Sequence, residues 1–404
     1  MAKRLIQPSL ADLKQDIAGV IPLPLILNWA SSKRDVKKHN DLLAPYIIKG
    51  TVVSSDSSGL SKLSSQKSLL EVLKLVSEPK EVIFKYGSST SGKAIGVWAA
   101  DNTEMFYPEA IPVSKVVESM VEAQTEIASL KVQVGMAVHF GEFYEIGGGL
   151  CGDEADFVEE AAESFSGKGE IVISESVKEK LPENNFKLVK KDVKGLKEAL
   201  YTVISTKPQR VVLRETAGSY PYPFTDSFYK FLKSSKVSEL KREDGMYKNL
   251  SKNRVITLVR VDHDEKKLLL DFLTDMALGN SIMESVSKEF GIERVKSNGG
   301  LGIFASTDVR DSLAFARRIK QVLTFNGYVC SVGMAKGEVL IFPMKEGEEI
   351  AGGPVNVASK LAEDVGGRGV IFADSSVTQK PKVKLKGSKF ELEVSGVMLK
   401  GLKL

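Results

Sequence analysis

The stretch GRGVIFADSSV at residues 367–377 is similar to GKGEIVISESV at residues 167–177, 200 positions earlier. A second pair, VQVGMAVHFGEF at 132–143 and CSVGMAKGEVLIF at 330–342, shows the same similarity. Such self-similarity indicates a structural unit that occurs twice, here with about 155 residues in each copy. The chain is therefore expected to contain two related domains in tandem.

Two further echoes align the front halves of the copies with an offset of 206. SGKAIGVWA (91–99) matches SNGGLGIFA (297–305), and GTVVSSDSSGLS (50–61) falls on ITLVRVDHDEKK (256–267). At the other end, VKGLKEALYTV (193–203) resembles LKGLKL (399–404). On this alignment the second copy stops before the final strand that the first copy has.

Within each copy the apolar period alternates between strands and helices. Helical patterns cover 68–78 and 267–290, then 113–130 and 309–323, and a last helix begins near Asp156 or Asn356. This order predicts an α/β fold, an α+β sandwich with a sheet on one side and helices on the other. We divide the chain into an N-terminal extension (1–44) packed on the first copy, the first copy (45–205), a linker (206–252) and the second copy (253–404).

The composition narrows the class of protein. With 404 residues, 43% hydrophobic and 27% charged, the chain suits a soluble globular protein, and a net charge of +4 spread along it gives no nucleic-acid footprint. Two cysteines and three histidines argue against a disulfide framework and a Cys/His zinc site, and favour a cytoplasmic setting. The most apolar segment, 20–27, is interrupted by Pro22 and Pro24 and is too short to span a membrane.

A phosphate loop is the alternative interpretation of GSSTSGK at 87–93, which has the motif's spacing up to its lysine. Ala94 follows where the motif needs a hydroxyl for Mg²⁺, and the next residues look like a strand where a helix is needed. We therefore favour a strand-loop-strand hairpin over a phosphate loop.

The stretch EIAGGPVNVASKLAEDVGGRGVIFADSSV (349–377) resembles the region of class III adenylate and guanylate cyclases that reads Asp-x-Trp-Gly-x-x-Val-Asn-x-Ala-x-Arg. SDSSGLSKL (55–63) is similar to the metal loop of that family, AVHFGEF (137–143) to its His-x-Gly-Glu strand, and VKGLKEALYTV to its closing hairpin. The resemblance implies two cyclase-homology domains with ferredoxin-like cores. It also implies that they pair head to tail as an intramolecular pseudo-two-fold dimer, so that the chain is a monomer.

In that family one domain holds two metal ions with two aspartates. The resemblance puts Asp56 at the first metal position, followed by Gly59 as the loop glycine, and Gly92 at the second; the second copy has Asp262 and Asn298 there. Neither copy keeps two carboxylates, so Mg²⁺ or Mn²⁺ would lose part of the negative charge that holds it.

The partner domain supplies base-selecting and transition-state residues in the family. In the second copy these positions fall on Glu349 (base-selecting acid), Arg294 (base-selecting cation), Asn356 and Lys360 (transition-state pair) and Lys400 (hairpin lysine near the triphosphate). At the positions that correspond to Arg294, Glu349, Asn356 and Lys360, the first copy has Ser88, Gly149, Asp156 and Glu160. Two acids there would repel a triphosphate.

The resemblance therefore implies two unequal sites. The first, which includes Asp56 and the second-copy residues, could bind ATP or GTP, whereas the second, with Asp262, Asn298, Asp156 and Glu160, is vestigial. We also expect Lys93, beside Gly92, to contact the triphosphate in place of a metal. Structural interpretations compete at five positions. These are Asp56 as a turn residue, Asn356 as the N-cap of a helix at 357–365, His139 as strand packing, and Lys360 and Arg294 as solvated surface charges.

The function expected from these residues is a catalytically degenerate pseudo-cyclase. It would bind a nucleoside triphosphate or act as a regulatory module for an unidentified protein partner. The alternative is an active, weak or Mn²⁺-dependent adenylate cyclase that converts ATP to cyclic AMP and pyrophosphate. Loss of a metal ligand and of the arginine fork favours the degenerate protein, since each ~1.4 kcal/mol lost is a tenfold lower rate.

Overall fold

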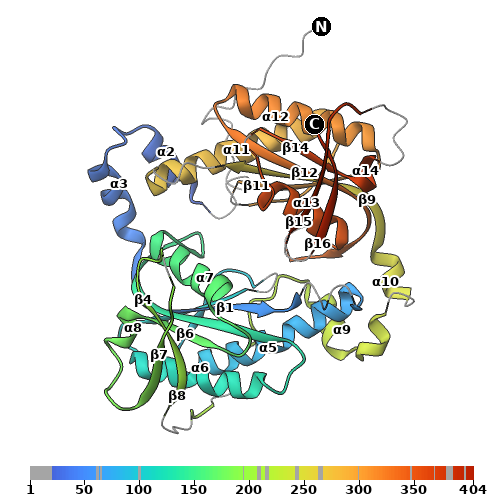
Figure 1. Cartoon of the computed structure of the whole chain (residues 1–404). Coiled ribbons are helices and arrows are strands. Elements are labelled where there is room, and N and C mark those ends of the chain that lie inside the picture. Colours follow the sequence, from blue (N-terminus) through green and yellow to red (C-terminus); the bar gives the residue numbers. More distant parts are fainter. Residues whose placement is uncertain are drawn as a thin grey trace. The chain divides into compact units, whose positions relative to one another are not determined.

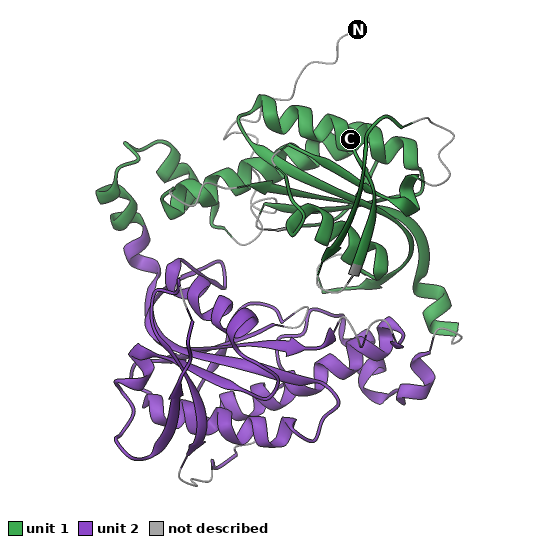
Figure 2. Cartoon of the chain, in the orientation of Figure 1, with its two compact units in different colours: residues 1–42, 243–404 green, residues 43–242 purple. Residues whose placement is uncertain are grey.

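Two compact units make up the chain (Figures 1 and 2). In the computed structural model, Leu43–Arg242 form one unit and Met1–Leu42 with Glu243–Leu404 form the other. The residues described are 21–60, 63, 66–98, 102–193, 195–206, 211–213, 218–241, 245–262, 267–298, 300–345, 348–367, 369–378, 385–394 and 397–404. Within them, no helix combines the length and the apolar character needed to cross a membrane.

An eight-stranded sheet forms the centre of the first copy. Its strand order is β2-β3-β1-β4-β6-β8-β7, with β5 paired to β4. The strands are β1 (Ile47–Ser58), β2 (Lys93–Ala94), β3 (Thr103–Pro108), β4 (Gln133–Ile146), β5 (Gly149–Cys151), β6 (Ile171–Ser174), β7 (Phe186–Lys190) and β8 (Leu200–Thr206). β4 and β6 are parallel, and the other pairs are antiparallel.

The second copy repeats this topology strand for strand. Its order is β10-β11-β9-β12-β14-β16-β15, with β13 paired to β12. The strands are β9 (Ser251–Asp262), β10 (Glu293–Asn298), β11 (Leu301–Ser306), β12 (Val329–Pro343), β13 (Glu348–Ala351), β14 (Ile371–Asp374), β15 (Ser388–Val394) and β16 (Val397–Lys403). The prediction of a tandem α/β repeat is confirmed, and the head-to-tail pairing stays a prediction.

Helices follow the strands at matching places in the two copies. The first copy has α5 (Leu69–Ser89), α6 (Val113–Ile127), α7 (Asp153–Phe165) and α8 (Glu175–Lys178). The second has α11 (Leu269–Phe290), α12 (Val309–Phe325), α13 (Gly353–Glu363) and α14 (Ser375–Thr378). The described residues also include α2 (Leu23–Ala30), α3 (Val36–Leu43), α9 (Asp226–Ser234), α10 (Gly245–Leu250) and the short η2 (Ala44–Tyr46) and η3 (Val237–Leu240).

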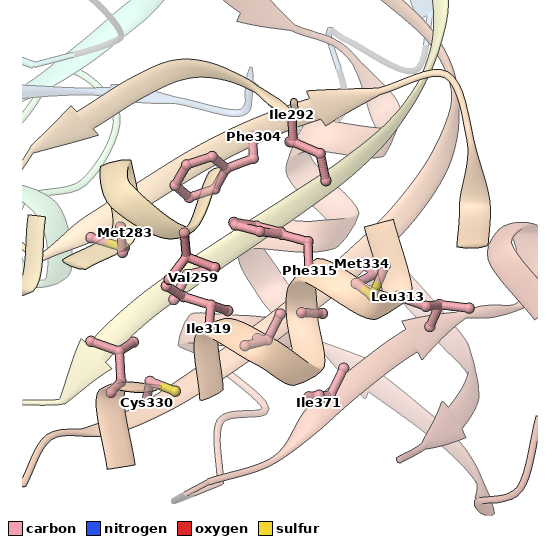
Figure 3. Close-up of a cluster of buried hydrophobic side chains, with 14 of the residues drawn as sticks. Val259, Met283, Ile292, Phe304, Leu313, Phe315, Ile319, Cys330, Met334 and Ile371 are labelled. Atoms are coloured by element: carbon pink, nitrogen blue, oxygen red, sulfur yellow. The ribbon is translucent and has the colours of Figure 1, made fainter. Parts of the chain in front are cut away.

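Helices cover both faces of the second sheet, which corrects the expectation of helices on one side only. Val259 and Val261 of β9 lie in a buried cluster with residues of α11 and α12, part of which Figure 3 shows. Ile256 and Leu258 of the same strand lie in another cluster with Ala358 of α13. Because successive strand residues point to opposite faces, an apolar β9 buries side chains against both layers.

The approach of α13 to the sheet depends on Gly333 of β12. A Cβ atom at this position would lie 1.9 Å from the carbonyl oxygen of Ala358 in α13. Any side chain there would force the helix away from the strand, so the glycine fixes how closely α13 packs.

The described part of the N-terminal extension up to Leu42 belongs to the unit of the second copy, not to the first copy as expected. Trp29 of α2 is completely buried, and its indole N–H donates to the Asp271 carboxylate of α11 at 2.9 Å. Arg34 lies 3.8 Å from the same carboxylate. A pattern of prolines identifies an extension but says nothing about which of two similar domains it contacts.

Residues 218–241 of the linker belong to the unit of the first copy, whereas 245–252 belong to that of the second. Lys74 of α5 donates to the carbonyl oxygens of Leu232 and Lys233, at 3.0 and 2.8 Å. Tyr220 stacks on Trp98, with ring centroids 5.8 Å apart. These contacts make 218–241 a packed layer on α5 and the hairpin beyond it.

Gly87, Ser88 and Ser89 of the phosphate-loop candidate are the last residues of a helix, so the strand expected before Gly87 was wrong, whereas a strand does follow at Lys93. α5 begins with a capping box at Ser68 and Glu71 and continues past Pro79 to Ser89. The turn after it leads directly into the two-residue strand β2. The apolar residues that precede Gly87 are thus the buried face of a helix.

The second copy has its final strand, contrary to the alignment of the chain ends. Gly401, Leu402 and Lys403 of β16 pair with β14 as Leu200, Tyr201 and Thr202 of β8 pair with β6. The similarity of the two LKGL-like segments therefore came from composition and not from equivalent positions.

Candidate functional site

The clearest polar constellation of the second copy joins two strands beside α13. The Nζ atom of Lys296, on β10, donates to the Glu349 carboxylate of β13 at 2.9 Å. The side chain of Glu349 is only 16% exposed, and its other oxygen accepts from the Ile350 backbone N–H at 3.2 Å. A largely covered carboxylate held by a lysine presents both an acceptor and a donor, which is the chemistry needed to read the edge of a base.

Lys296, and not Arg294, is the cation at this position. The β10–β11 pairing shifts register between Arg294 and Lys296, and Arg294 lies 3.4 Å from Glu284 of α11 instead. The sequence comparison missed Lys296 because a bulge changes which residue of an alternating strand faces a given neighbour. The only signal in the sequence was the second cation two residues further on.

The transition-state candidates lie on one side of α13. Gly352 is the N-cap, with φ 142°, and the Asn356 N–H donates to its carbonyl oxygen at 3.2 Å. Asn356 is therefore an exposed residue of the first turn, and its interpretation as the N-cap was wrong. Lys360 is one turn further along, where its ammonium lies 3.7 Å from Asp364. The spacing of four residues puts the Asn356 amide and the Lys360 cation on one face.

Lys400 does not occupy the hairpin position. It lies within β16 and pairs with Glu391 of β15, with 2.7 Å between Nζ and Oε1. The strand register makes it the counterpart of Ala199 in the first copy. Lys194, in the hairpin segment of the first copy, lies outside the described residues.

Asp56 lies in a strand and not in a turn. It lies near the end of β1, two positions before the strand ends at Ser58, and it pairs with Gly135 of β4. Gly59 follows with φ 79°, a conformation that favours glycine, and begins the turn. The half-buried carboxylate is thus fixed at the end of a central strand.

Gly92 is not at the tip of a hairpin. It lies in the turn between α5 and β2, and a Cβ atom there would be 2.6 Å from the Tyr107 ring and 2.8 Å from the methyl carbon of Met105. Of the residues between β2 and β3, 95–98 and 102 are described, and 99–101 lie outside the described residues. An aspartate that acted as a metal ligand could not occupy position 92 in this packing.

The equivalent of Asp56 in the second copy is Arg260, not Asp262. Ser55 pairs with Met136 in the first copy as Val259 pairs with Val332 in the second, so Asp56 and Arg260 follow at the same place. Asp262 lies 3.8 Å from the Arg260 guanidinium, and Asn298 ends β10 opposite Leu301. The copies differ by two residues in this region, which an ungapped offset of 206 could not show.

The matching face of the first copy is acidic. Burial, together with the nearby Glu159 and Asp153, raises the pKa of Asp156, and burial with the charge of Glu159 raises that of Glu104 to about 7. Glu160 is exposed on the same helix, α7. Neighbouring carboxylates would repel a triphosphate, and the expectation that this second site is vestigial stays a prediction.

Lys93 is already paired within the first copy. Its Nζ lies 2.6 Å from the Glu145 carboxylate of β4. The proposed contact with a triphosphate would have to replace this exposed ion pair, and it stays a prediction.

His139 does more than fill space in its strand. Its Nε2 lies 2.5 Å from Glu154 of α7, and its Nδ1 lies 2.9 Å from the Ser174 hydroxyl. Lys197 donates to the other Glu154 oxygen. This buried histidine therefore ties the first turn of α7 to β4 and β6, a role that strand periodicity alone could not reveal.

Comparison with known proteins gives structural similarity only. No family model and no curated protein matches the sequence. Among solved structures, a class III adenylyl cyclase-like ATP-binding protein from Pseudomonas aeruginosa matches 82% of this chain and 85% of its own, at 11% identity and a TM-score of 0.50.

Two single cyclase domains are also similar. The adenylyl cyclase CyaB from P. aeruginosa matches 41% of this chain and 97% of its own, at 16% identity and a TM-score of 0.36. The guanylate cyclase domain of RhGC from Catenaria anguillulae, in complex with GTP, matches 40% and 99%, at 19% identity and a TM-score of 0.34.

The first of these matches extends over both copies, and each copy has the same strand order around a covered central sheet. The chain therefore has the class III nucleotidyl cyclase fold, present in two tandem copies.

Proposed function

We propose that this protein binds a nucleoside triphosphate, ATP or GTP, through its second copy and does not convert it to a cyclic nucleotide. The main support for nucleotide binding is the Lys296–Glu349 pair, which combines a hydrogen-bond donor and an acceptor beside α13. The ATP-binding protein with a similar fold over most of its length supports the choice of ligand.

The residues around the pair suit the two ends of a nucleotide. Lys296 and Glu349 would hydrogen-bond the base, which is flat and has both donors and acceptors at its edge. The exposed Asn356 amide and the Lys360 ammonium, on the first two turns of α13, would approach the phosphates. Positive charge and backbone N–H groups near a helix start both favour an anion.

The described residues do not fit a two-metal centre. Asp56 is the carboxylate that the resemblance puts at the first metal position. At the second, the Tyr107 ring leaves no room for an aspartate in place of Gly92. The described residues after β2, 95–98 and 102, include no acid. Arg260 replaces the first metal carboxylate in the second copy. Two-metal phosphoryl transfer needs ligands for both ions, and these residues supply them for one at most.

Calorimetric titration of the full chain with ATP, GTP and a non-hydrolysable analogue tests binding. Lys296→Ala and Glu349→Gln should each weaken binding by about tenfold, the value of one charge-assisted hydrogen bond. Lys288→Gln is the matched control, because Lys288 is a 69% exposed lysine in an ion pair on α11 of the same copy. Absence of binding heat for all three nucleotides would overturn the proposal of nucleotide binding.

Turnover is tested separately by incubation with ATP or GTP and Mn²⁺, followed by an assay for cyclic nucleotide. The proposal expects no product above that of heat-inactivated protein. Sustained formation of cyclic AMP or cyclic GMP would show the alternative, an active cyclase, to be correct.

A further inference from the structure

A pocket lies on the second copy, at the C-terminal end of α12. It has a volume of about 560 Å³ and is formed by α12, the start of β14 and two residues beside β15 and β16. Its lining consists of Arg317, Lys320, Gln321, Thr324, Phe325, Ile371, Lys386 and Leu404. Neither the expected nucleotide residues nor the Lys296–Glu349 pair takes part in it.

The polar lining is cationic on one side. Arg317, Lys320, Gln321 and Thr324 recur at positions i, i+3, i+4 and i+7 of α12, so they form a single stripe facing the pocket. Lys386 adds a third positive charge from the segment before β15. Among the described residues, no acidic side chain lines the pocket and none of the three cations has an ion-pair partner. The adjacent Arg318, by contrast, lies 3.3 Å from Glu289.

The apolar lining offers a surface for a flat or alkyl group. Phe325 is 51% exposed, although it ends a helix whose other aromatic residue, Phe315, is completely buried. Ile371 connects the floor of the pocket to the core cluster in Figure 3. An exposed aromatic ring beside unpaired cations suits a ligand that is anionic at one end and apolar at the other.

At two matching places in the first copy, the side chains bind partners within that copy. Counted from the N-caps Pro112 and Asp308, Gln124 takes the place of Lys320, and it donates to the Val134 carbonyl oxygen at 2.8 Å. Glu170, at the place of Val370, binds Lys191 at 2.7 Å and the Thr202 hydroxyl at 2.6 Å. The second copy has lost this acid and gained a lysine, which leaves its positive charges for an outside partner.

We infer that this pocket binds a small phosphate monoester with an aromatic group. Three cations suit a phosphate dianion better than a monovalent carboxylate, because Arg317 can bind two phosphate oxygens at once while the lysines add point charges. Phe325 would stack against the aromatic ring of the ester.

Phenyl phosphate is the probe, compared with inorganic phosphate and with phenol by calorimetry of the full chain. Phenyl phosphate should bind with a stoichiometry of one and at least several-fold more tightly than phosphate, whereas phenol should not bind. Arg317→Gln and Lys320→Gln should each weaken phenyl phosphate by about tenfold. Phe325→Ala should remove the advantage of phenyl phosphate over phosphate and leave phosphate binding intact.

The matched control is Arg310→Gln, an exposed arginine at the other end of α12. Equal weakening by Arg310→Gln and Arg317→Gln would show attraction by general charge and overturn the pocket. No binding heat for phenyl phosphate at millimolar concentration would overturn it as well. All three pocket variants change exposed or half-buried side chains, and unchanged thermal unfolding would confirm that they fold.

The proposal for this pocket and the proposal for the nucleotide site can be tested separately. Lys296→Ala should weaken ATP and leave phenyl phosphate unchanged, and Arg317→Gln should do the reverse. If ATP competes with phenyl phosphate and Arg317→Gln weakens both, the two ligands share this pocket, and the inference of a separate site is wrong.

Discussion

The Nε2 atom of His139 lies 2.5 Å from the Glu154 carboxylate, and this contact fixes the first turn of α7 against the central sheet of the first copy. Burial lowers the pKa of His139. Burial opposes ionisation of Glu154 too, but hydrogen bonds from Lys197 and His139 outweigh it and lower the Glu154 pKa. The native pair is therefore a neutral imidazole that donates to an ionised carboxylate.

Acid should destabilise the first copy through this pair. Below the ordinary histidine pKa of 6.5 the unfolded chain binds a proton that native His139 resists, and Glu154 adds the same effect at lower pH. The free energy of unfolding should fall from pH 7 to pH 4, and His139→Gln should flatten the part between pH 7 and 5. Denaturant unfolding followed by Trp98 fluorescence in a Trp29→Phe background reports on this copy alone, because the chain has two tryptophans. An unchanged slope in His139→Gln would contradict the assignment.

Glu104 should act in the opposite direction. Burial and Glu159 raise its pKa to about 7, so the native state holds a proton that the unfolded chain has released above its ordinary pKa of 4.5. Stability from this group is complete below pH 4.5 and is lost as the pH rises through 7. At pH 8, Glu104→Gln should stabilise the first copy by about 2 kcal/mol, measured with the same Trp98 reporter. Glu159→Gln, which removes only the neighbouring charge, should give a smaller gain, and a loss of stability in Glu104→Gln would contradict the raised pKa.

Gly92→Asp should not create a metal site. The new Cβ would lie 2.6 Å from the buried Tyr107 ring, so the variant should lose about 2 kcal/mol of stability and gain no affinity for Mn²⁺. Gly149→Asp is the control in the same copy, since the closest atom to its new Cβ is a carbonyl oxygen 3.9 Å away. Thermal unfolding and a Mn²⁺ titration measure the two effects. A tighter Mn²⁺ isotherm for Gly92→Asp would restore the sequence alignment that the structure corrects.

The contact between α2 and α11 should stabilise the second copy. Trp29→Ala removes a completely buried ring and its hydrogen bond to Asp271, which should cost about 3 kcal/mol. Hydrogen exchange of 23–30 and of α11 should rise in this variant. Leu27→Ala, at a 39% exposed position of the same helix, should change exchange little. Equal protection in both variants would show that α2 does not depend on Trp29.

Sequence similarity between the copies was sufficient for the fold, because a repeat preserves the apolar pattern that each strand needs. It located the helix α13 to within a few residues, since the 200-residue offset holds through β13 and β14, and the role of Glu349 stays a prediction. The alignment was wrong where the copies differ in length. The offset of 206 made Asp262 the equivalent of Asp56, and it made Arg294 the cation expected beside Glu349. A bulge or a two-residue difference leaves the apolar alternation intact, so periodicity cannot detect it.

The order of the residues was thus enough for two cyclase-like copies, for an acidic α7 in the first, and for an α13 in the second that carries Asn356 and Lys360. Only the tertiary structure decided that Lys296 meets Glu349, that Arg260 stands where Asp56 does, and that α2 packs on the second copy. The physical reason is that burial patterns are encoded locally along the chain. The distance between two polar side chains depends instead on strand register and on which helix a distant segment contacts.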